Sequence, residues 1–178
     1  DVPSLAVALL RGAFEYQGQK CSAASRAYVP RSLADALRDR LAAEVAAIPM
    51  GDPTDFSNFM GAVIDRKSFQ NCRRYIDGAR ADPAASILVG GECDDAHGFF
   101  VRPTVIETAD PRAPSMCEEI FGPILTLFVY EDHRLDEALT LCDETSPYAL
   151  TGAIFARDRG AIAHMSARLR HAAGNFYV

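Results

Sequence analysis

Phe14–Arg26, FEYQGQKCSAASR, is the stretch of sequence around which the rest of the chain is organised. Apolar residues at helical spacing over residues 2–15 lead into it, so we expect a helix to end here and a loop to begin. Gly18 stands three residues before Cys21, and small residues follow the thiol. Glycine lets backbone and ligand approach closely, and a thiol in such a loop is placed to react with a small molecule.

Helices and strands are predicted to alternate outward from this stretch. Several of the strands are continuous apolar runs, as in ILTLFVY at Ile124–Tyr130, which indicates a sheet covered on both faces. The sequence therefore predicts an α/β fold with a doubly wound, largely parallel sheet and helices on both faces. The expected helices cover 2–15, 32–48, 67–81, 114–119, 135–142 and 162–169, and the expected strands cover 25–29, 87–89, 99–107, 124–130, 149–156 and 174–178.

Two local expectations can be compared directly with a structure. Ser32, with Asp35 three residues later, is predicted to be the N-cap of its helix. Pro103 interrupts the stretch over 99–107, which predicts an edge or bent strand there.

Composition and charge narrow the class of protein. The 178 residues suit one domain, 49% of them are hydrophobic, and the net charge is −6. An acidic chain without a clustered basic face is not expected to bind nucleic acid. Its apolar runs are too short to cross a bilayer, so we expect no membrane association. The five scattered cysteines form no C-x-x-C pair and the histidines show no metal-ligand spacing, so we expect a reducing compartment, no disulfides and no metal.

The cysteines differ in their surroundings. A lone cysteine in an intracellular protein is most often an inert, buried residue. Cys72 and Cys142 fit that description, because both lie on apolar faces of predicted helices. Cys21 is flanked instead by Lys20 and Ser22 in a loop that contains glycine, which favours a reactive thiol.

A second motif, EEIFGP at Glu118–Pro123, lies about a hundred residues downstream. Adjacent glutamates on a helical turn point in different directions, so at most one of them is expected to enter a given cleft. The simplest alternative is a solvated acidic turn.

The two motifs together, GQKCS at Gly18–Ser22 and EEIFGP at Glu118–Pro123, resemble those of the aldehyde dehydrogenase superfamily. Residues 13–23, GAVID at Gly61–Asp65 and AGNFY at Ala173–Tyr177 resemble the L-glutamate γ-semialdehyde dehydrogenase branch, also called 1-pyrroline-5-carboxylate dehydrogenase. The resemblance covers essentially the whole chain. It implies oxidation of L-glutamate γ-semialdehyde, a small-molecule aldehyde, to L-glutamate with NAD as cofactor, in proline degradation.

The resemblance also implies roles for individual residues. Cys21 would be the catalytic nucleophile, with its backbone N–H helping to hold the oxyanion. Glu119 would bind the nicotinamide ribose hydroxyls and Phe121 would pack near the ribose and the nicotinamide. Lys20 and Ser22 would lie where the amino-acid end of the substrate binds.

The chain departs from the superfamily in what it lacks. It contains no E-x-G-G-K string with the general-base glutamate, no oxyanion asparagine and no dinucleotide-binding domain, and both ends look cut. Residues 1–178 are therefore expected to be a catalytic-domain fragment, inactive by itself, of a homo-oligomeric protein of the cytoplasm, or of the mitochondrial matrix in a eukaryote. Two alternatives remain: another aldehyde dehydrogenase, such as one for succinate semialdehyde, and a non-catalytic structural or interaction module.

Overall fold

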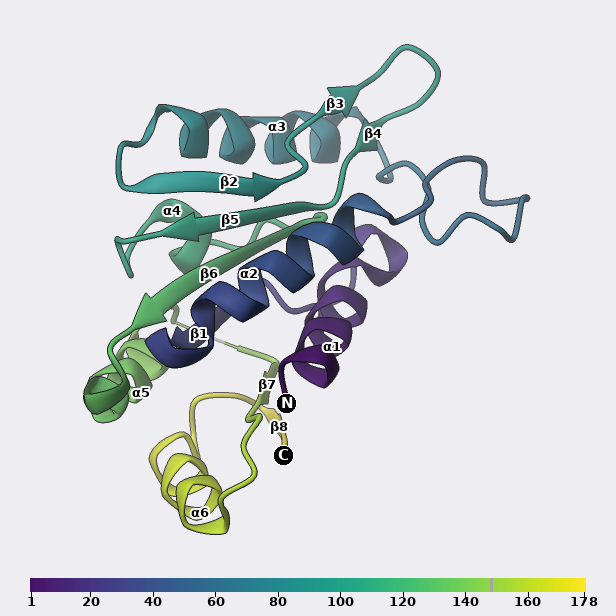
Figure 1. Ribbon diagram of the computed structural model, residues 1–178. Helices are drawn as coiled ribbons and strands as arrows, with labels where there is room; N and C mark the ends of the chain where they lie inside the picture. Colours follow the sequence, from purple (N-terminus) through teal and green to yellow (C-terminus); the bar gives the residue numbers. More distant parts are fainter. Residues whose placement is uncertain (148) are drawn as a thin grey trace.

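A computed structural model describes residues 1–147 and 149–178 (Figure 1). Its main sheet has four strands in the order β1-β6-β5-β2, and neighbouring strands are parallel except for the antiparallel edge pair β2–β5. The predicted parallel-dominated α/β fold is thus confirmed. The strands are β1 (Arg26–Pro30), β2 (Ala85–Val89), β5 (Thr104–Thr108) and β6 (Ile124–Tyr130).

Helices cover both faces of this sheet, as the alternation of side chains along its strands requires. Val105, Leu125 and Leu127 point to one face, where they form a core with α1 (Val2–Phe14) and α2 (Arg31–Ala46). The opposite face is covered by α3 (Arg66–Ala81), whose core includes the neighbouring residues Ile106 and Ile124 of the same two strands. The two faces therefore have separate hydrophobic cores.

The remaining elements are short and lie around this centre. Two further pairs of strands form small sheets of their own, β3 with β4 and β7 with β8. The bounds are η1 (Glu15–Gly18), β3 (Cys93–Asp94), β4 (Phe100–Val101), α4 (Pro114–Cys117), η2 (Asp132–Arg134), α5 (Leu135–Glu144), β7 (Thr151–Ala153), α6 (Arg159–Arg168) and β8 (Asn175–Tyr177).

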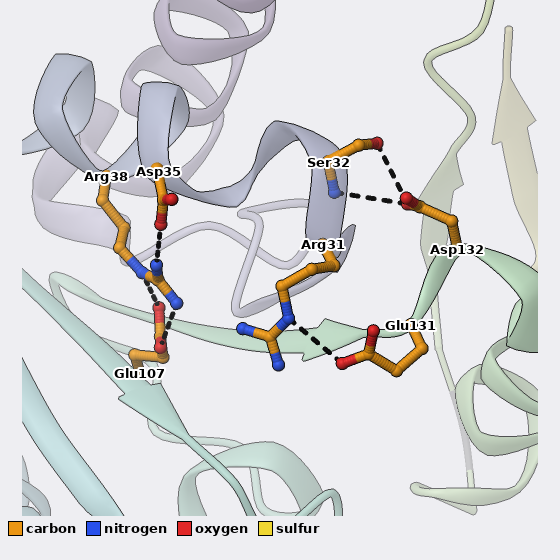
Figure 2. Close-up of polar contacts among 7 residues, drawn as sticks. All are labelled: Arg31, Ser32, Asp35, Arg38, Glu107, Glu131 and Asp132. Atoms are coloured by element: carbon orange, nitrogen blue, oxygen red, sulfur yellow. Dashed lines mark hydrogen bonds and ion pairs between the residues drawn. The ribbon is translucent and has the colours of Figure 1, made fainter.

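The N-terminus of α2 differs from the prediction. Pro30 ends β1 and is also the N-cap residue, with no side-chain cap, so Ser32 lies inside the first turn. Its N–H and hydroxyl both donate to Asp132 of η2, at 3.3 and 3.0 Å (Figure 2). The strand runs into the helix without a loop, and a carboxylate from a neighbouring segment therefore satisfies a free N–H of the helix.

Two predicted strands are shorter than expected. The stretch over 99–107 is divided at Pro103, because proline cannot donate to a ladder, and only its second half joins the main sheet. The stretch over 149–156 has strand geometry only in β7.

Within the part of the chain that is described, no helix combines the length and the apolar character needed to span a bilayer. The same residues contain no group of three or more His, Cys, Asp or Glu side chains that could hold a metal ion.

Candidate active site

Cys21 stands at the tip of a tight turn with its side chain exposed. The turn is closed by the N–H of Ala23, which donates to the carbonyl of Lys20 at 3.0 Å. Three consecutive residues before it, Tyr16, Gln17 and Gly18, have φ values of 51°, 60° and 64°. These left-handed residues follow the end of α1 closely, so the right-handed helix stops before the turn that carries Cys21.

Gly18 is where this loop meets the second motif. A Cβ added to Gly18 would lie 2.4 Å from the carbonyl oxygen of Gly122 and 2.7 Å from that of Ala13. Such distances leave no space for any side chain, and the positive φ independently favours glycine. The thiol loop and the EEIFGP loop are therefore in direct backbone contact, although they are about a hundred residues apart in sequence.

Two glutamines of the thiol loop bind the segment Gly61–Ile64. The Gln17 side-chain amide both donates to and accepts from the backbone of this segment, at 3.2 and 3.3 Å. Gln19 accepts from the N–H at the end of the segment at 2.9 Å and donates to the hydroxyl of Ser68 at 3.0 Å. Gly61–Asp65 resembled a family motif in the sequence, but no contact was predicted for it. In the structure it binds the loop that carries Cys21.

Lys20 and Ser22 flank the thiol, and they differ in whether their side chains already have a partner. The Lys20 ammonium lies 3.3 Å from the Glu15 carboxylate and 5.4 Å from the centre of the Tyr16 ring. Ser22 is exposed and makes no side-chain hydrogen bond within the residues described. The lysine is thus already paired at the edge of the site, while the serine hydroxyl is available to a ligand.

The EEIFGP loop does not have the helical geometry predicted for its glutamates. Helix α4 ends at Cys117, and Glu118 has an extended backbone. Both glutamates are exposed, but the Glu118 carboxylate accepts a short hydrogen bond from the Tyr75 hydroxyl, whereas Glu119 is unpaired within the described part of the chain. Phe121 has a positive φ of 56° and is 40% exposed. Both glutamates line one cavity, so the prediction that at most one of them enters a given cleft is wrong; the chain is extended here and not helical.

All five predicted site residues line one cavity of about 710 Å³. Lys20, Cys21 and Ser22 come from the thiol loop, and Glu119 and Phe121 come from the EEIFGP loop. The cavity is bordered further out by apolar residues of α1, α5, β7 and β8. A thiol, a free carboxylate and an exposed aromatic ring in one concave space can hold an electrophile beside an aromatic cofactor.

Three of the other four cysteines have thiols whose pKa is raised by burial. Cys72 is fully buried in α3, and desolvation raises the pKa of its thiol to about 12. Desolvation also raises the pKa values of Cys93 and Cys142. Cys142 is only half-buried, so the prediction that it belongs to the core was too strong. A high pKa leaves little nucleophilic thiolate.

A comparison with known families matches this geometry. The profile described as "Aldehyde dehydrogenase family" matches residues 1–178, and the chain belongs to that family. Its relatives define the branch more closely. The chain is 56% identical over 178 residues to the mitochondrial delta-1-pyrroline-5-carboxylate dehydrogenase of Dictyostelium discoideum and 51% identical over 179 residues to that of Bos taurus. Both alignments cover all of this chain and 32% of the relative, so the chain spans about a third of the length of these proteins.

Solved structures give the same result. The delta-pyrroline-5-carboxylate dehydrogenase of Mycobacterium tuberculosis, in a crystal structure bound with NAD, superposes on this chain with a TM-score of 0.92 at 47% identity. The superposition covers 100% of this chain and 32% of the other.

Sequence reasoning found the residues that face the cavity and missed those that support them. Gln17, Gln19, Asn71 and Tyr75 were assigned no role. Gln17 and Gln19 stood within the quoted motif, so a polar residue on each side of Gly18 was a usable signal. Asn71 and Tyr75 lie in an ordinary amphipathic helix, and their contacts depend on tertiary structure alone.

Proposed function

We propose that the protein is an NAD-dependent dehydrogenase that oxidises L-glutamate γ-semialdehyde to L-glutamate, with residues 1–178 forming its catalytic domain. One observation carries the proposal: Cys21 is exposed in the same cavity as Glu119 and Phe121. The identity of 56% to a 1-pyrroline-5-carboxylate dehydrogenase over the whole chain supports the substrate. The reaction would belong to proline degradation.

Cys21 supplies the nucleophile in this mechanism. Its thiolate attacks the aldehyde carbon, a carbon–sulfur bond forms, and the carbonyl electrons move to oxygen. The Cys21 backbone N–H makes no hydrogen bond within the described residues, so it is free to donate to that oxyanion. Loss of hydride from the same carbon leaves a thioester, and water then cleaves the carbon–sulfur bond to release the carboxylic acid and restore the thiol.

Glu119 and Phe121 fit the requirements of a nicotinamide cofactor. When bound, NAD accepts the hydride. The Glu119 carboxylate is exposed to the cavity without a partner in the described chain, and a carboxylate can accept hydrogen bonds from two ribose hydroxyls. Phe121 presents an apolar ring two residues further on, where it can pack against the ribose and the nicotinamide.

Lys20 and Ser22 would bind the amino-acid end of the substrate. The Ser22 hydroxyl is exposed in the cavity. Lys20 is held at the cavity edge by Glu15, and its remaining donors can reach a carboxylate. A substrate with both an aldehyde and a charged end would therefore contact residues on both sides of the nucleophile.

The proposal extends to the setting of the whole protein. We infer a homo-oligomer, located in the cytoplasm of a bacterium or in the mitochondrial matrix of a eukaryote. The curated relatives from Dictyostelium discoideum and Bos taurus are described as mitochondrial, which supports the second case. Sedimentation of the full-length protein and its fractionation from the source cells test these two points.

Steady-state kinetics of the full-length protein test the proposed reaction. NADH formation is measured with L-glutamate γ-semialdehyde and with succinate semialdehyde, for the wild type and for Cys21→Ala. We expect kcat/KM to favour the first substrate, and Cys21→Ala to abolish turnover with both while retaining NAD binding. A preference for succinate semialdehyde would point to a different branch of the family, and no turnover of any aldehyde would favour a non-catalytic module.

A further inference from the structure

One stripe of α3 contacts both loops of the candidate site. Ser68, Asn71, Cys72 and Tyr75 lie at helical spacings of i, i+3, i+4 and i+7 and so share one face of the helix. We call these four residues the α3 stripe. None of them was assigned a role in the mechanism above.

The first residue of the stripe is bound to the thiol loop. The Ser68 hydroxyl accepts from the side chain of Gln19, two residues before Cys21, at 3.0 Å. Ser68 is itself fixed, because its N–H donates to Asp65, the N-cap of α3, at 2.7 Å. The thiol loop is therefore attached to the rigid, capped end of the helix.

The other three residues hold the EEIFGP loop. The Asn71 side-chain amide donates to the carbonyl of Ile120 at 3.0 Å, and the Tyr75 hydroxyl donates to Glu118. A Cβ on Gly122 would lie only 2.2 Å from the Cys72 sulfur. Residues 118, 120 and 122 of the loop thus contact α3, and Glu119 and Phe121 between them line the cavity together with these neighbours.

Two members of the stripe are buried, and the other two are half-buried. Cys72 is fully buried and Tyr75 is 7% exposed. Desolvation, followed by the hydrogen bond to Glu118, raises the pKa of Tyr75 to about 12. The hydroxyl therefore remains a proton donor at neutral pH, in surroundings where its bond to a carboxylate is stronger than in water.

We propose that the α3 stripe sets the separation between the Cys21 thiol and the cofactor-binding pair Glu119 and Phe121. Its members are positioning residues, since they act through Gln19, Glu118, Ile120 and Gly122. The inference rests on the proposed function, because it assigns these residues to the spacing of nucleophile and NAD. It predicts that the two ends of the stripe are separable: one end governs the aldehyde reaction and the other governs NAD affinity.

The Tyr75 end is tested by Tyr75→Phe in the full-length protein. We expect the dissociation constant for NAD, measured by calorimetry, to rise about tenfold, the factor for one lost hydrogen bond to a charged group. The KM for the aldehyde at saturating NAD should stay within about twofold, because the thiol loop is untouched. Glu118→Gln keeps an acceptor for Tyr75 and should weaken NAD binding less than Glu118→Ala does.

A control is Arg38→Gln. Arg38 donates to the Glu107 carboxylate at 2.6 and 2.7 Å, between α2 and β5, so the variant loses hydrogen bonds to a carboxylate away from both the α3 stripe and the cavity. It should leave NAD affinity within about twofold of the wild type.

The Ser68 end is tested by Ser68→Ala. We expect kcat/KM for the aldehyde at saturating NAD to fall about fivefold, as for one lost neutral hydrogen bond, with NAD affinity unchanged. Ser32→Ala is the control, because it removes a serine hydroxyl from the first turn of another helix, where the partner is Asp132 (Figure 2).

The outcomes separate the inference from the function on which it rests. A split between NAD affinity and aldehyde kinetics, with both controls unaffected, supports the inference. If the wild type binds NAD and oxidises the semialdehyde but Tyr75→Phe and Ser68→Ala match it, or if both variants lose both properties equally, the inference is wrong and the function stands. If the wild type does not bind NAD, both are wrong.

Discussion

Helices α2 and α3 invite comparison, because each has 16 residues and each covers one face of the same sheet. Helix α2 attaches to the sheet through buried apolar residues and through polar contacts that are largely exposed. Helix α3 has an apolar face too, but its polar contacts reach the two loops that carry Cys21 and Glu119.

Three polar contacts connect α2 to β5 and to the segment that follows β6 (Figure 2). Arg38 binds Glu107 of β5 through two parallel hydrogen bonds of 2.6 and 2.7 Å, and Arg31 pairs with Glu131. These contacts join the helix to a strand and to the residue that follows β6, and they involve none of the five predicted site residues. The comparison indicates that one helix stabilises the sheet, while the other also determines the geometry of the site.

The largest expected difference is in reactivity, between the buried thiol of Cys72 in α3 and the exposed thiol of Cys21 in the loop that α3 contacts. At pH 8 a thiol with a pKa of about 12 is ionised in only about one molecule in ten thousand. Cys72 should therefore react with iodoacetamide at a negligible rate, whereas the exposed Cys21 should be labelled within minutes. Mass spectrometry of the native, full-length protein measures both rates. Equal labelling would contradict the assignment of Cys21.

A smaller effect is expected where the two loops touch. Gly18→Ala places a Cβ against the Gly122 carbonyl and forces the loops apart. Because displacements of about 1 Å in a site can reduce rates about 100-fold, we expect a loss of that order in kcat/KM. Gly78→Ala in α3 is the matched control, since a Cβ there meets nothing within 4 Å. If Gly18→Ala were as active as the wild type, the close contact between the two loops would not matter for the site.

Truncation of a core side chain of α2 tests whether this helix affects the candidate site. Leu41 is fully buried, so Leu41→Ala should lower the free energy of unfolding by about 2–5 kcal/mol. If α2 serves the sheet alone, the KM values for NAD and aldehyde should remain those of the wild type at a temperature where the variant is folded. Denaturant unfolding and steady-state kinetics measure the two quantities, and altered KM values would extend the positioning role to α2.

The smallest effect is expected at the ion pair of α2. Arg38→Gln loses the paired hydrogen bonds to Glu107, whose side chain is 20% exposed. After allowance for solvent screening, the loss of stability should be about 1 kcal/mol. Thermal unfolding in low and high salt measures this contribution. A change in NAD affinity would show that the two faces of the sheet are coupled.

The sequence predicted the elements that bury an apolar face, but it did not predict the contacts between distant segments. Apolar periodicity located α1, α2, α3 and β6, because each of these elements buries a continuous face. The local predictions were wrong at Ser32, whose N–H donates to a carboxylate from η2, and at Glu118 and Glu119, because the helix ends two residues earlier than predicted. Both errors arise from contacts between distant segments.

The candidate site shows the same limit. Cys21 could be singled out because its neighbours are unusual for an inert cysteine, whereas Glu119 was assigned a role only through the family resemblance of its motif. The contact of Gly18 with Gly122 and the α3 stripe could not be found, since helical spacing alone predicts only that residues such as Cys72 and Tyr75 face inward. What those residues touch is decided by the packing of α3 on the sheet.

Measuring the covalent state of Cys21 during turnover tests most directly whether Cys21 is the nucleophile. Full-length protein is mixed with NAD and L-glutamate γ-semialdehyde, quenched in acid and digested, and the cysteine-containing peptides are weighed. If Cys21 is the nucleophile, we expect a glutamyl adduct on the peptide that contains Cys21, and we expect it to be absent without NAD and absent in Cys21→Ala. An adduct on a different cysteine, or rapid turnover by Cys21→Ala, would contradict it.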